Sequence, residues 1–482
     1  MREEVIIGID AGSTHLKTGI YSLKGDLLSI KHFRVPVYHS KPGYSEYKPE
    51  EIFCQMCRHL QEQLADSYHP AAIGISSFGE SFVPMGADGS PLSDMIAWFD
   101  MRGEELINSL AEKSGTAFLY HLTGQYPSGK YALAKFLWLR KNHPDLIRKT
   151  HCFLFMQDYL AFRLTGQLCT DYSLASRSML YDIREKKWDP GLLEQCGIHP
   201  SQLPIPLPSG GMCGKITSHA SQFTGLPQGI PVVLAGHDHA SASVAAGLKE
   251  KNIVLDSMGT SETAVFSSYD IDMDKAFSSR LCSYPYLKNE RRLIASIQGC
   301  GASIEWLAGL LFEKNIYRHF FQSAQSKKIV KEMAPVTLPF LRGVQEFPSL
   351  SASVMDLKDF HKKEDLCYSL LEGLCLEYLR RLKAGERICN TEFNTIRAAG
   401  RLSTEPVFMQ LKADITAKTV EVLDQSEAVS QGAAILAGLF CGCISIWKPK
   451  IKTSYSPSND FDFYKQRFQK YIEVLEEICQ HP

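Results

Sequence analysis

The sequence lacks the charge patterns that mark proteins binding nucleic acids or membrane surfaces. Its 482 residues include 52 Lys and Arg and 53 Asp and Glu, giving a formal net charge of -1, and no long basic block occurs. Near-neutral charge without such a block argues against both partners, although it is compatible with a small anionic substrate. We therefore expect small-molecule ligands, no nucleic acid and no membrane.

Long apolar runs are missing too, and we expect no secretory leader. The longest apolar candidate, Gly432–Phe440, is far too short for a membrane span. A short charged stretch precedes Ile6 in place of a leader, and the 14 cysteines are mostly scattered singly through apolar stretches. Scattered thiols of this kind predict a reducing, cytoplasmic location.

What the chain does have is an ordinary globular composition and more length than one core needs. It is 44% hydrophobic and 22% charged. Single cores stop growing beyond roughly 250–300 residues, so two large domains are expected. Dimers are the commonest soluble oligomers, and a homodimer is accordingly the default expectation for its assembly.

The two halves of the chain begin with a similar arrangement. β-branched runs alternate with tight turns over the first forty residues, which predicts a meander of strands, and a helical pattern at 48–66 and an apolar strand at 71–77 follow. Most of 94–197 has a helical pattern, and 203–214 has the composition of a surface connector. Residues 252–268 repeat the order of strand, small-residue turn and strand. This repetition predicts two related α/β domains.

A turn of small residues follows the first apolar strand. Asp10 ends the run, Gly12-Ser13-Thr14 form the turn, and Lys17 comes soon after. Exposed backbone N–H groups in such a turn can bind phosphate oxygens, and an acid beside them makes sense if a divalent cation bridges the two, usually through water. The alternative is an ordinary hairpin with aspartate at a turn position.

Similar turns recur later in the chain. Gly259-Thr260-Ser261 lies between two β-rich runs, Gly299–Ser303 precedes a helical pattern, and Gly400 stands between a strand and a helix. Helix N-termini attract negative charge. Each turn alone is a weak signal, because glycine turns join strands and helices in most proteins. Together they favour a polyphosphate held between two domains.

Asp238 stands at the mouth of a small-residue helix, in the stretch AGHDHASA that follows an apolar strand. An acid at this place is often only a helix N-cap. It is also where a general base could accept the proton of a substrate hydroxyl. Metal binding by the flanking His237 and His239 is disfavoured, because the two are too close in sequence to share one helical face.

Five ordered motifs make the chain resemble the FGGY family of carbohydrate kinases over nearly its whole length, within the superfamily that also holds hexokinase and actin. The motifs are IGIDAGSTHLKTGIY, SFGESFVPM followed by MIAWFDMR, DYLAFRLTGQLCTDYSLAS, AGHDHASASVAAGL and QGAAILAG. The GHD segment and YPSGKYALAKFLWLRKNHP look most like the L-fuculokinase-like branch. The resemblance implies an α/β fold of two ribonuclease H-like domains, of the actin/hexokinase type, with a ligand cleft between them, and it implies ATP and Mg2+ as cofactors.

The resemblance also implies roles for individual residues. Asp238 would be the general base that deprotonates the sugar hydroxyl, and Asp10 would bind Mg2+ through water. The implied nucleotide-binding residues are Thr14, His15, Lys17, Gly259, Thr260, Gly301, Glu305, Gly400 and Arg401. The implied sugar-binding residues are Glu80, Trp98, Asp100, Arg102, Tyr126 and Asp238.

Plainer interpretations stand beside several of these roles. Trp98 could be a core residue and Arg102 a surface charge that opens the next helix. Four polar residues of the third motif are interpreted as structural, satisfying buried backbone or capping: Asp158, Thr170, Asp171 and Ser173. The implied domains are an N-terminal one at residues 1–245, with the sugar site, first phosphate motif and base, and a nucleotide-binding one at residues 246–482.

Two departures from the family pattern stand out. Gly400-Arg401-Leu402 replaces the usual second glycine of the adenosine segment, so we expect Arg401 to stack on or crowd the adenine and alter nucleotide affinity or choice. The usual Gly-Glu-Arg-x-Pro segment is replaced by Leu341–Pro348, in a loop that looks shortened. Neither change removes Asp10 or Asp238, so an active enzyme is expected.

The sequence therefore favours an ATP-dependent kinase of an open-chain sugar, with a fuculose- or xylulose-like ketose as acceptor. One alternative is a kinase of gluconate or another polyol or sugar acid. Another is a catalytically silent, sugar-sensing member of the same fold. A chaperone- or actin-like nucleotide switch would share only the first motif, and the substrate segment and Asp238 argue against it.

Overall fold

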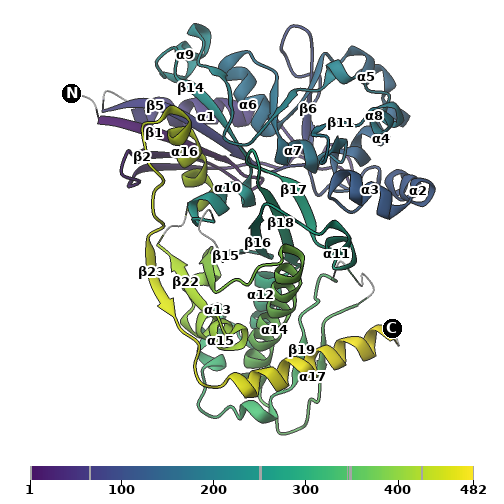
Figure 1. Cartoon of the computed structure of the whole chain (residues 1–482), viewed down its shortest axis with the longest axis vertical. Coiled ribbons are helices and arrows are strands. Elements are labelled where there is room, and N and C mark those ends of the chain that lie inside the picture. Colours follow the sequence, from purple (N-terminus) through teal and green to yellow (C-terminus); the bar gives the residue numbers. More distant parts are fainter. Residues whose placement is uncertain are drawn as a thin grey trace. The chain divides into compact units, whose positions relative to one another are not determined.

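The computed structural model describes residues 3–64, 67–248, 252–344, 346, 350–424 and 427–480, and the chain packs as two units (Figure 1). Unit 1 comprises Met1–Ala246, Cys282–Arg292 and Glu427–Lys448. Unit 2 comprises Gly247–Leu281, Leu293–Ser426 and Pro449–Pro482. This division differs from a single boundary between residues 245 and 246, because two later segments pack with the N-terminal part of the chain.

Two sequence expectations extend beyond the described residues. The helical pattern at 48–66 forms α1 (Pro49–Leu64), with proline in the first turn where its missing N–H costs nothing, and residues 65 and 66 lie outside the description. Of the altered segment Leu341–Pro348, residues 345, 347 and 348 likewise lie outside it.

The sheet of unit 1 has the strand order β13-β14-β5-β1-β2-β3. Its strands are β1 (Glu3–Ala11), β2 (His15–Ser22), β3 (Leu27–Arg34), β5 (Tyr68–Ser77), β13 (Met212–Lys215) and β14 (Pro231–His237). The first three pair antiparallel, as the sequence predicts, whereas β5 runs parallel to β1 and β14 runs parallel to β5. The isoleucine and valine side chains of β1 are fully buried, which fits a central strand covered on both faces.

Helix α16 (Ala428–Cys441) explains why a C-terminal segment belongs to unit 1. It packs on β1, β5 and β14 beside α10 (Asp238–Ala245) (Figure 1). A Cβ on Gly8 would overlap the carbonyl oxygen of Ser430, and a Cβ on Gly74 would overlap that of Ala433. The helix backbone can therefore lie directly on the sheet because both positions are glycine.

A mostly helical insertion fills unit 1 between β5 and β14, as expected for 94–197. Its helices are α2 (Glu104–Ser114), α3 (Thr116–Thr123), α4 (Ala132–Asn142), α5 (Pro144–Lys149), α6 (Met156–Thr165), α7 (Tyr172–Arg177), α8 (Pro190–Cys196), η1 (Pro200–Gln202) and α9 (Ser218–Thr224). Short strands pair within unit 1 as β4 (Glu46–Tyr47) with β7 (Met95–Ile96), β6 (Phe82–Met85) with β8 (Cys152–Phe155), β9 (Cys169–Asp171) with β12 (Ile205–Leu207), and β10 (Tyr181–Asp182) with β11 (Lys187–Trp188). The segment 203–214, expected to be a surface connector, is partly buried at Leu203 and Ser209 and contains β12, because β9 offers that strand a partner backbone.

Unit 2 has its own sheet, with strands in the order β18-β16-β15-β21-β22-β23. The strands are β15 (Ile253–Met258), β16 (Glu262–Ser268), β18 (Arg291–Ile297), β21 (Thr395–Ala399), β22 (Thr419–Leu423) and β23 (Ile451–Tyr455). β15 and β16 form the antiparallel hairpin expected around Gly259, while β21 runs parallel to both β15 and β22. The second half thus repeats the hairpin-plus-parallel-strand arrangement of the first.

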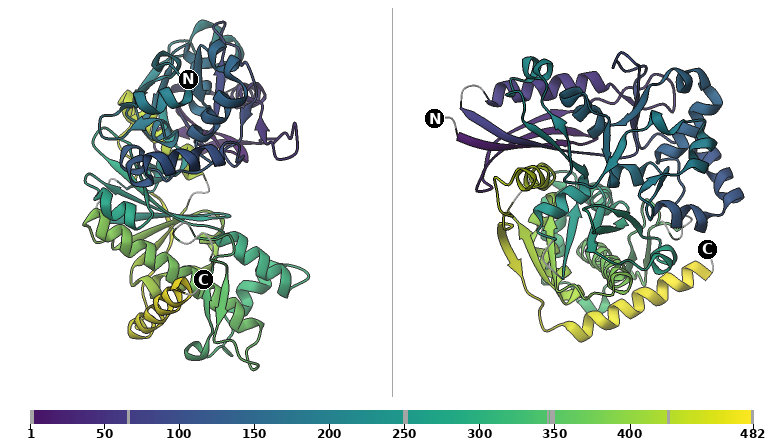
Figure 2. Two further views of the ribbon diagram at one scale, coloured as in Figure 1. Left: turned by 90° about the vertical axis from the view of Figure 1, so that its right-hand side faces the viewer. Right: turned by 45° about the horizontal axis from the view of Figure 1, so that its top comes forward.

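The remaining elements of the chain are mostly helices of unit 2. They are β17 (Cys282–Pro285) of unit 1, and α11 (Met273–Ser278), α12 (Cys300–Leu311), α13 (Ile316–Ala324), η2 (Lys331–Met333), β19 (Val336–Leu338), β20 (Ser353–Met355), α14 (Lys363–Cys389), η3 (Arg401–Thr404), α15 (Pro406–Thr416) and α17 (Phe461–Gln480). The long helix α17, yellow in Figure 2, packs against α14, α15 and β19. Across the described ranges, every helix is too short or too polar to cross a membrane.

Candidate active site

The first charged cluster of unit 1 lies at the β1–β2 hairpin. Asp10 and Lys17 face each other across the antiparallel pair. The Nζ of Lys17 lies 3.8 Å from Oδ2 of Asp10 and 2.9 Å from Oε2 of Glu427, the residue just before α16. Thr14 and His15 are exposed at the tip of the turn. Lys17 is therefore shared between two carboxylates, of which sequence reasoning anticipates only Asp10.

The negative charge of Asp10 is only partly compensated by Lys17. Burial raises its pKa to about 7; Lys17 opposes this rise, and Asp238 and Glu427 add to it. Its Oδ1 is buried and has no hydrogen-bond partner in the part of the chain that the structure describes. A buried acceptor without a partner costs stability unless a ligand or water satisfies it.

An orphaned carboxylate oxygen fits a hard divalent cation or one of its bound waters. Among the described residues, no group of three or more His, Cys, Asp and Glu side chains is arranged to hold a metal ion. A cation at Asp10 would accordingly take its remaining ligands from water and phosphate oxygens, as Mg2+ usually does.

The second cluster surrounds Asp238, where β14 ends and α10 begins. Its Oδ1 accepts a hydrogen bond of 2.6 Å from the backbone N–H of His239, and its side chain is 30% exposed. Burial acts to raise the pKa of Asp238, but the neighbouring His237 and His239 outweigh it and hold that pKa below the ordinary value. Asp238 is therefore ionised at neutral pH and able to accept a proton.

Glu80 is held in an unusual backbone conformation beside this cluster. It follows β5 with a φ of 70°, a region that residues other than glycine rarely adopt and that concentrates at functional sites. Its carboxylate pairs with the guanidinium of Arg177, the last residue of α7. A Cβ added to the preceding Gly79 would lie 3.2 Å from Cβ of Arg177 and 3.3 Å from Cδ2 of His237. The Glu80 turn, Arg177 and the Asp238 segment are therefore neighbours.

Sequence reasoning misses the polar residues that complete this group. The Oε1 of Gln125 accepts hydrogen bonds from Nη1 of Arg177 at 3.3 Å and from the hydroxyl of Tyr131 at 2.9 Å. Gln125 is fully buried. Arg177 is the last residue of the stretch TDYSLASR, and Gln125 directly precedes Tyr126. Their position next to these motif residues is the only sequence feature that points to them.

The other sequence-predicted sugar residues form a separate arrangement. Asp100 accepts hydrogen bonds from the backbone N–H of Arg102 at 2.9 Å and from that of Ser45 at 2.8 Å, and Arg102 pairs with both Asp100 and Glu46. The Arg102 side chain is only 8% exposed, so the interpretation of a surface charge is wrong.

Two aromatic residues of the predicted sugar site pack against other rings. Trp98 is partly buried against the core of unit 1, in line with its plainer interpretation, and its carbonyl oxygen accepts a hydrogen bond of 3.1 Å from Nζ of Lys135. Tyr126 is buried, with its ring centroid 4.6 Å from that of Tyr120. Both residues thus have packing roles in unit 1.

The small-residue turns of unit 2 converge at the end of β15. The backbone N–H of Ala302 donates to the carbonyl oxygen of Thr260 at 3.2 Å, and a Cβ on Gly301 would overlap the carbonyl oxygen of Gly259. A Cβ on Gly400, whose φ is 100°, would likewise overlap the carbonyl oxygen of Met258. The structure therefore brings together Gly259, Thr260, Gly301 and Gly400, which lie up to 141 residues apart in the sequence.

Arg401 and Glu305 meet at a third residue of unit 2. The guanidinium carbon of Arg401 lies 4.3 Å from the ring centroid of Tyr317 on α13. Burial raises the pKa of Tyr317, Glu305 raises it further and Arg401 lowers it, which places both charges beside this ring. Arg401 thus stacks on an aromatic side chain of the protein itself.

A buried charge cluster lies behind the β15–β16 turn. The Nζ of Lys412 on α15 pairs with both Asp256 on β15 and Glu262 on β16, and all three side chains are completely buried. Sequence reasoning gives no indication of this cluster. It fixes the two strands on either side of the Gly259–Ser261 turn.

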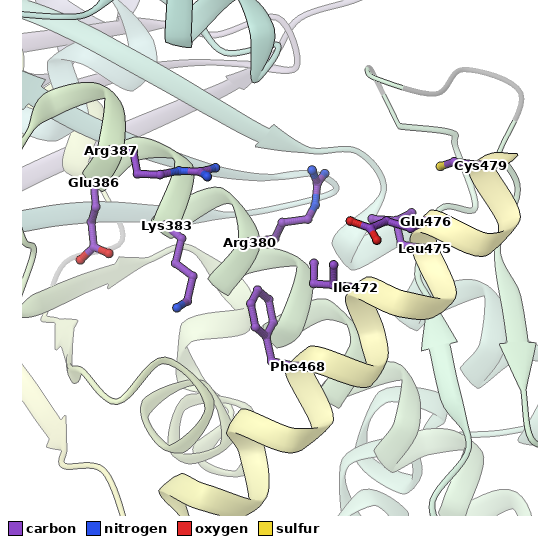
Figure 3. A pocket seen from close by; sticks show the side chains of 9 residues that line it. All are labelled: Arg380, Lys383, Glu386, Arg387, Phe468, Ile472, Leu475, Glu476 and Cys479. Carbon is purple, nitrogen blue, oxygen red and sulfur yellow. The ribbon is translucent and has the colours of Figure 1, made fainter.

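A cavity of about 660 Å³ also lies in unit 2, between α14 and α17. Figure 3 shows Phe468 and Ile472 of α17 extending toward Arg380 and Lys383 of α14. None of its nine lining residues is a sequence-predicted site residue. We therefore do not assign the sugar or nucleotide site to it.

Comparisons with known proteins identify the family to which both halves of the chain are similar. The model of the FGGY family of carbohydrate kinases, N-terminal domain, matches residues 5–245, and that of the C-terminal domain matches residues 255–441. The xylulose kinase of Bacillus subtilis is 26% identical, over 97% of this chain and 96% of that protein. The L-fuculokinase of Escherichia coli K12 is also 26% identical, over 90% of this chain and 92% of that protein.

A solved structure shares the whole fold. The crystal structure of xylulose kinase from Rhodospirillum rubrum has a TM-score of 0.91 and 20% identity, and the match covers 99% of both chains. This likeness confirms the two-domain α/β architecture expected from the sequence. Both halves of the family pattern are present in order, and the chain belongs to the FGGY family of carbohydrate kinases.

Proposed function

We propose that this carbohydrate kinase transfers the γ-phosphate of ATP to a hydroxyl of an open-chain ketose of the fuculose or xylulose type, with Asp238 as the general base. The observation that carries the proposal is the state of Asp238: a partly exposed carboxylate, ionised at neutral pH and anchored through one oxygen. Such a group can accept a hydroxyl proton without first losing its own.

Unit 1 supplies the acceptor side of the reaction in this proposal. Asp238 takes the proton of the attacking hydroxyl while the hydroxyl oxygen forms a bond to the γ-phosphorus and the bond to the ADP oxygen breaks. Positioning and charge stabilisation provide most of the rate, because the protein does little covalent chemistry. Lys17 offsets negative charge on the phosphate oxygens. A Mg2+ ion held through water at Asp10 would add further charge neutralisation.

Unit 2 supplies the nucleotide side. The convergence of Gly259, Thr260, Gly301 and Gly400 leaves backbone free of side-chain obstruction at the end of β15. The first turn of α12 adds N–H groups there, which favours an anion such as a phosphate. Glu305 lies farther along α12, and Arg401 directly follows Gly400 at the start of η3. Both would contact the rest of the nucleotide.

A neutral sugar fits the charges of unit 1 better than a sugar acid does. The guanidinium of Arg177 is paired with Glu80, and that of Arg102 with Asp100 and Glu46. The ammonium of Lys135 donates to three backbone carbonyls. These cations are therefore already engaged, and a substrate carboxylate would have to displace one of their partners.

One observation favours the second candidate, a sugar-acid kinase. Burial and the neighbouring Arg177 guanidinium lower the pKa of Lys130, and its Nζ lies 4.9 Å from the ring centroid of Tyr131. Glu80 also acts on the pKa of Lys130, so this amine lies beside the Glu80 group. Lys130→Met separates the two candidates: it should raise KM for a sugar acid by at least about tenfold and change KM for a ketose by less than about threefold.

A coupled ADP-release assay tests the proposal over a panel of ketoses, polyols and aldonates. We expect turnover with a ketose, and a loss of about 10²–10⁴-fold in kcat for Asp238→Asn, the range typical of a removed general base. Unchanged turnover in Asp238→Asn contradicts the assigned base. No turnover with any member of the panel supports the silent, sugar-sensing alternative.

Location and assembly are also part of the proposal. All 14 cysteines are described and carry free thiols, which supports a reducing, cytoplasmic location. The homodimer stays a prediction from the commonest assembly of soluble proteins, and light scattering of the purified chain measures it directly.

A further inference from the structure

The side chain of His237 reaches the carboxylate that follows it. Its Nδ1 lies 3.3 Å from Oδ1 of Asp238 and 3.4 Å from the hydroxyl oxygen of Tyr284 on β17. The ring is buried, and burial lowers its pKa to about 4, so it is neutral at assay pH. Of these two contacts, the one with Tyr284 is a hydrogen bond, in which the roles of donor and acceptor depend on the tautomer of the ring. A proton on Nδ1 would place a donor beside the carboxylate oxygen of Asp238, whereas a proton on Nε2 would leave two lone pairs facing each other there.

The backbone of His237 is fixed from the other side. Its N–H donates to Oγ of Ser173 at 2.8 Å. That hydroxyl donates in turn to Oδ2 of Asp171, which also accepts the hydroxyl of Ser209 and the N–H of Ser173. Asp171 and Ser173 are fully buried. The pair that the sequence indicates as structural therefore supports the peptide that carries the base.

Gly236 shows how closely the base segment lies against this support. Its φ is 83°, and a Cβ there would come within 2.5 Å of both Oδ2 of Asp171 and Oγ of Ser173. Its N–H donates to Oε1 of Gln157 at 2.6 Å. The segment Gly236–Asp238 is thus fixed at both of its first two amides before the ring of His237 engages the carboxylate.

We propose that His237 is a positioning residue for Asp238: its ring N–H and the N–H of His239 both hold Oδ1 and thereby leave Oδ2 to accept the proton of the substrate hydroxyl. The inference rests on the proposed role of Asp238 as the base. Such anchoring matters because a displacement of about 1 Å at the reacting group can lower the rate about 10²-fold.

Three substitutions of His237 separate positioning from mere packing. Asn carries an amide N–H near the place of Nδ1, Gln carries one near the place of Nε2, and Ala carries neither. We expect kcat for the best ketose of the panel to fall about 10–100-fold in His237→Ala and His237→Gln, with KM for ATP changed less than about threefold. His237→Asn should keep kcat within about threefold of the wild type, because it restores the donor that faces Oδ1.

Two control variants separate the positioning role of His237 from the role of Asp238 as the base. His219→Asn makes the same change on an exposed residue of α9 and should leave kcat unchanged. Asp238→Asn reports on the base itself: if it stays fully active, the proposed function is wrong. If Asp238→Asn is inactive while His237→Ala and His237→Gln match the wild type, only the positioning role is overturned. Equal losses in the Asn, Gln and Ala variants overturn it too.

Thermal unfolding is measured for every variant, since a buried histidine also packs. Should His237→Ala fail to fold, Tyr284→Phe provides the second route, because it removes the hydroxyl that shares Nδ1 and leaves the ring in place. It should lower kcat about two- to tenfold without raising KM for ATP, because the ring of His237 loses the hydrogen bond that orients it beside Asp238. A wild-type kcat in a folded Tyr284→Phe together with a wild-type kcat in His237→Gln contradicts the proposal.

Discussion

The β1–β2 hairpin of unit 1 and the β15–β16 hairpin of unit 2 have the same local form and opposite placement of charge. In the first, Asp10 and Lys17 lie beside the turn, and Lys17 is 25% exposed. In the second, Asp256, Glu262 and Lys412 are completely buried behind the turn. The first hairpin therefore keeps charged side chains beside its turn, whereas the buried charges of the second connect its two strands behind the turn.

The largest effect should come from removing the buried cation of the second hairpin. Lys412→Met leaves the carboxyl groups of Asp256 and Glu262 without their partner in the core of unit 2, and breaking a buried ion pair in this way costs about 3–5 kcal/mol. We expect a corresponding loss in the free energy of unfolding, measured by urea denaturation followed by circular dichroism. Weaker ATP binding should accompany this loss, because Lys412 connects the two strands that flank the Gly259–Ser261 turn.

The matched control is Lys470→Met, which removes an exposed lysine paired with Asp356 in the same unit. Exposed pairs contribute about 0–1 kcal/mol, so this variant should be close to the wild type. The comparison between the hairpins fails if Lys412→Met is no more destabilising than Lys470→Met.

The first hairpin should respond in the opposite way, with lost activity and a stable fold. Asp10→Asn removes the carboxylate proposed to hold the cation, and the loss of such an electrostatic group typically lowers kcat about 10²–10³-fold. ADP release measures this effect, with the exposed Asp145→Asn of unit 1 as the matched control. A kcat within a few-fold of the wild type would remove Asp10 from the site.

The pH dependence of the free energy of unfolding tests the role of Asp10 in the first hairpin separately from activity. Because burial raises the pKa of Asp10 from 3.8 to about 7, its ionisation disfavours the folded state as pH rises from about 4 to about 7. Asn cannot ionise, so Asp10→Asn should match the wild type near pH 4 and become more stable by about 1–3 kcal/mol near pH 8. Differential scanning calorimetry in the presence of a chelator measures the difference, and a gap that is constant with pH contradicts the assignment.

The sequence was sufficient to predict the hairpins but not the charges that complete them. Asp10, the small-residue turn and Lys17 lie within one short stretch, so their chemistry can be read locally. Glu427 reaches Lys17 of the first hairpin only because α16 packs on that sheet, although the two residues are hundreds of positions apart. Lys412 reaches the second hairpin only because α15 packs behind it. Long-range packing of this kind leaves no local pattern, because a buried lysine or a glutamate before a helix looks ordinary in sequence.

The sugar site shows the same limit. The sequence predicts that Glu80 binds the sugar, but it gives no indication of the ion pair that Glu80 forms with Arg177, the last residue of α7. The motif places Asp100 and Arg102 with Glu80 in the sugar pocket, whereas in the structure Arg102 pairs with both Asp100 and Glu46. Motif spacing thus identifies which segments matter, whereas the side-chain partners follow from how the insertion of unit 1 folds.

The smallest expected effect concerns the replaced glycine of unit 2. Arg401 stacks on Tyr317, and an exposed cation–π contact of this kind is worth roughly 0.5–1 kcal/mol. Because this stack holds the guanidinium beside the proposed nucleotide site, Arg401→Gly should raise KM for ATP about two- to fivefold and leave kcat unchanged, since the residue lies away from the reacting atoms. Tyr317→Phe keeps the ring and should leave KM unchanged. A lower KM for ATP in Arg401→Gly would mean that Arg401 crowds the nucleotide, and a lower kcat would mean that Arg401 also affects the position of the reacting atoms.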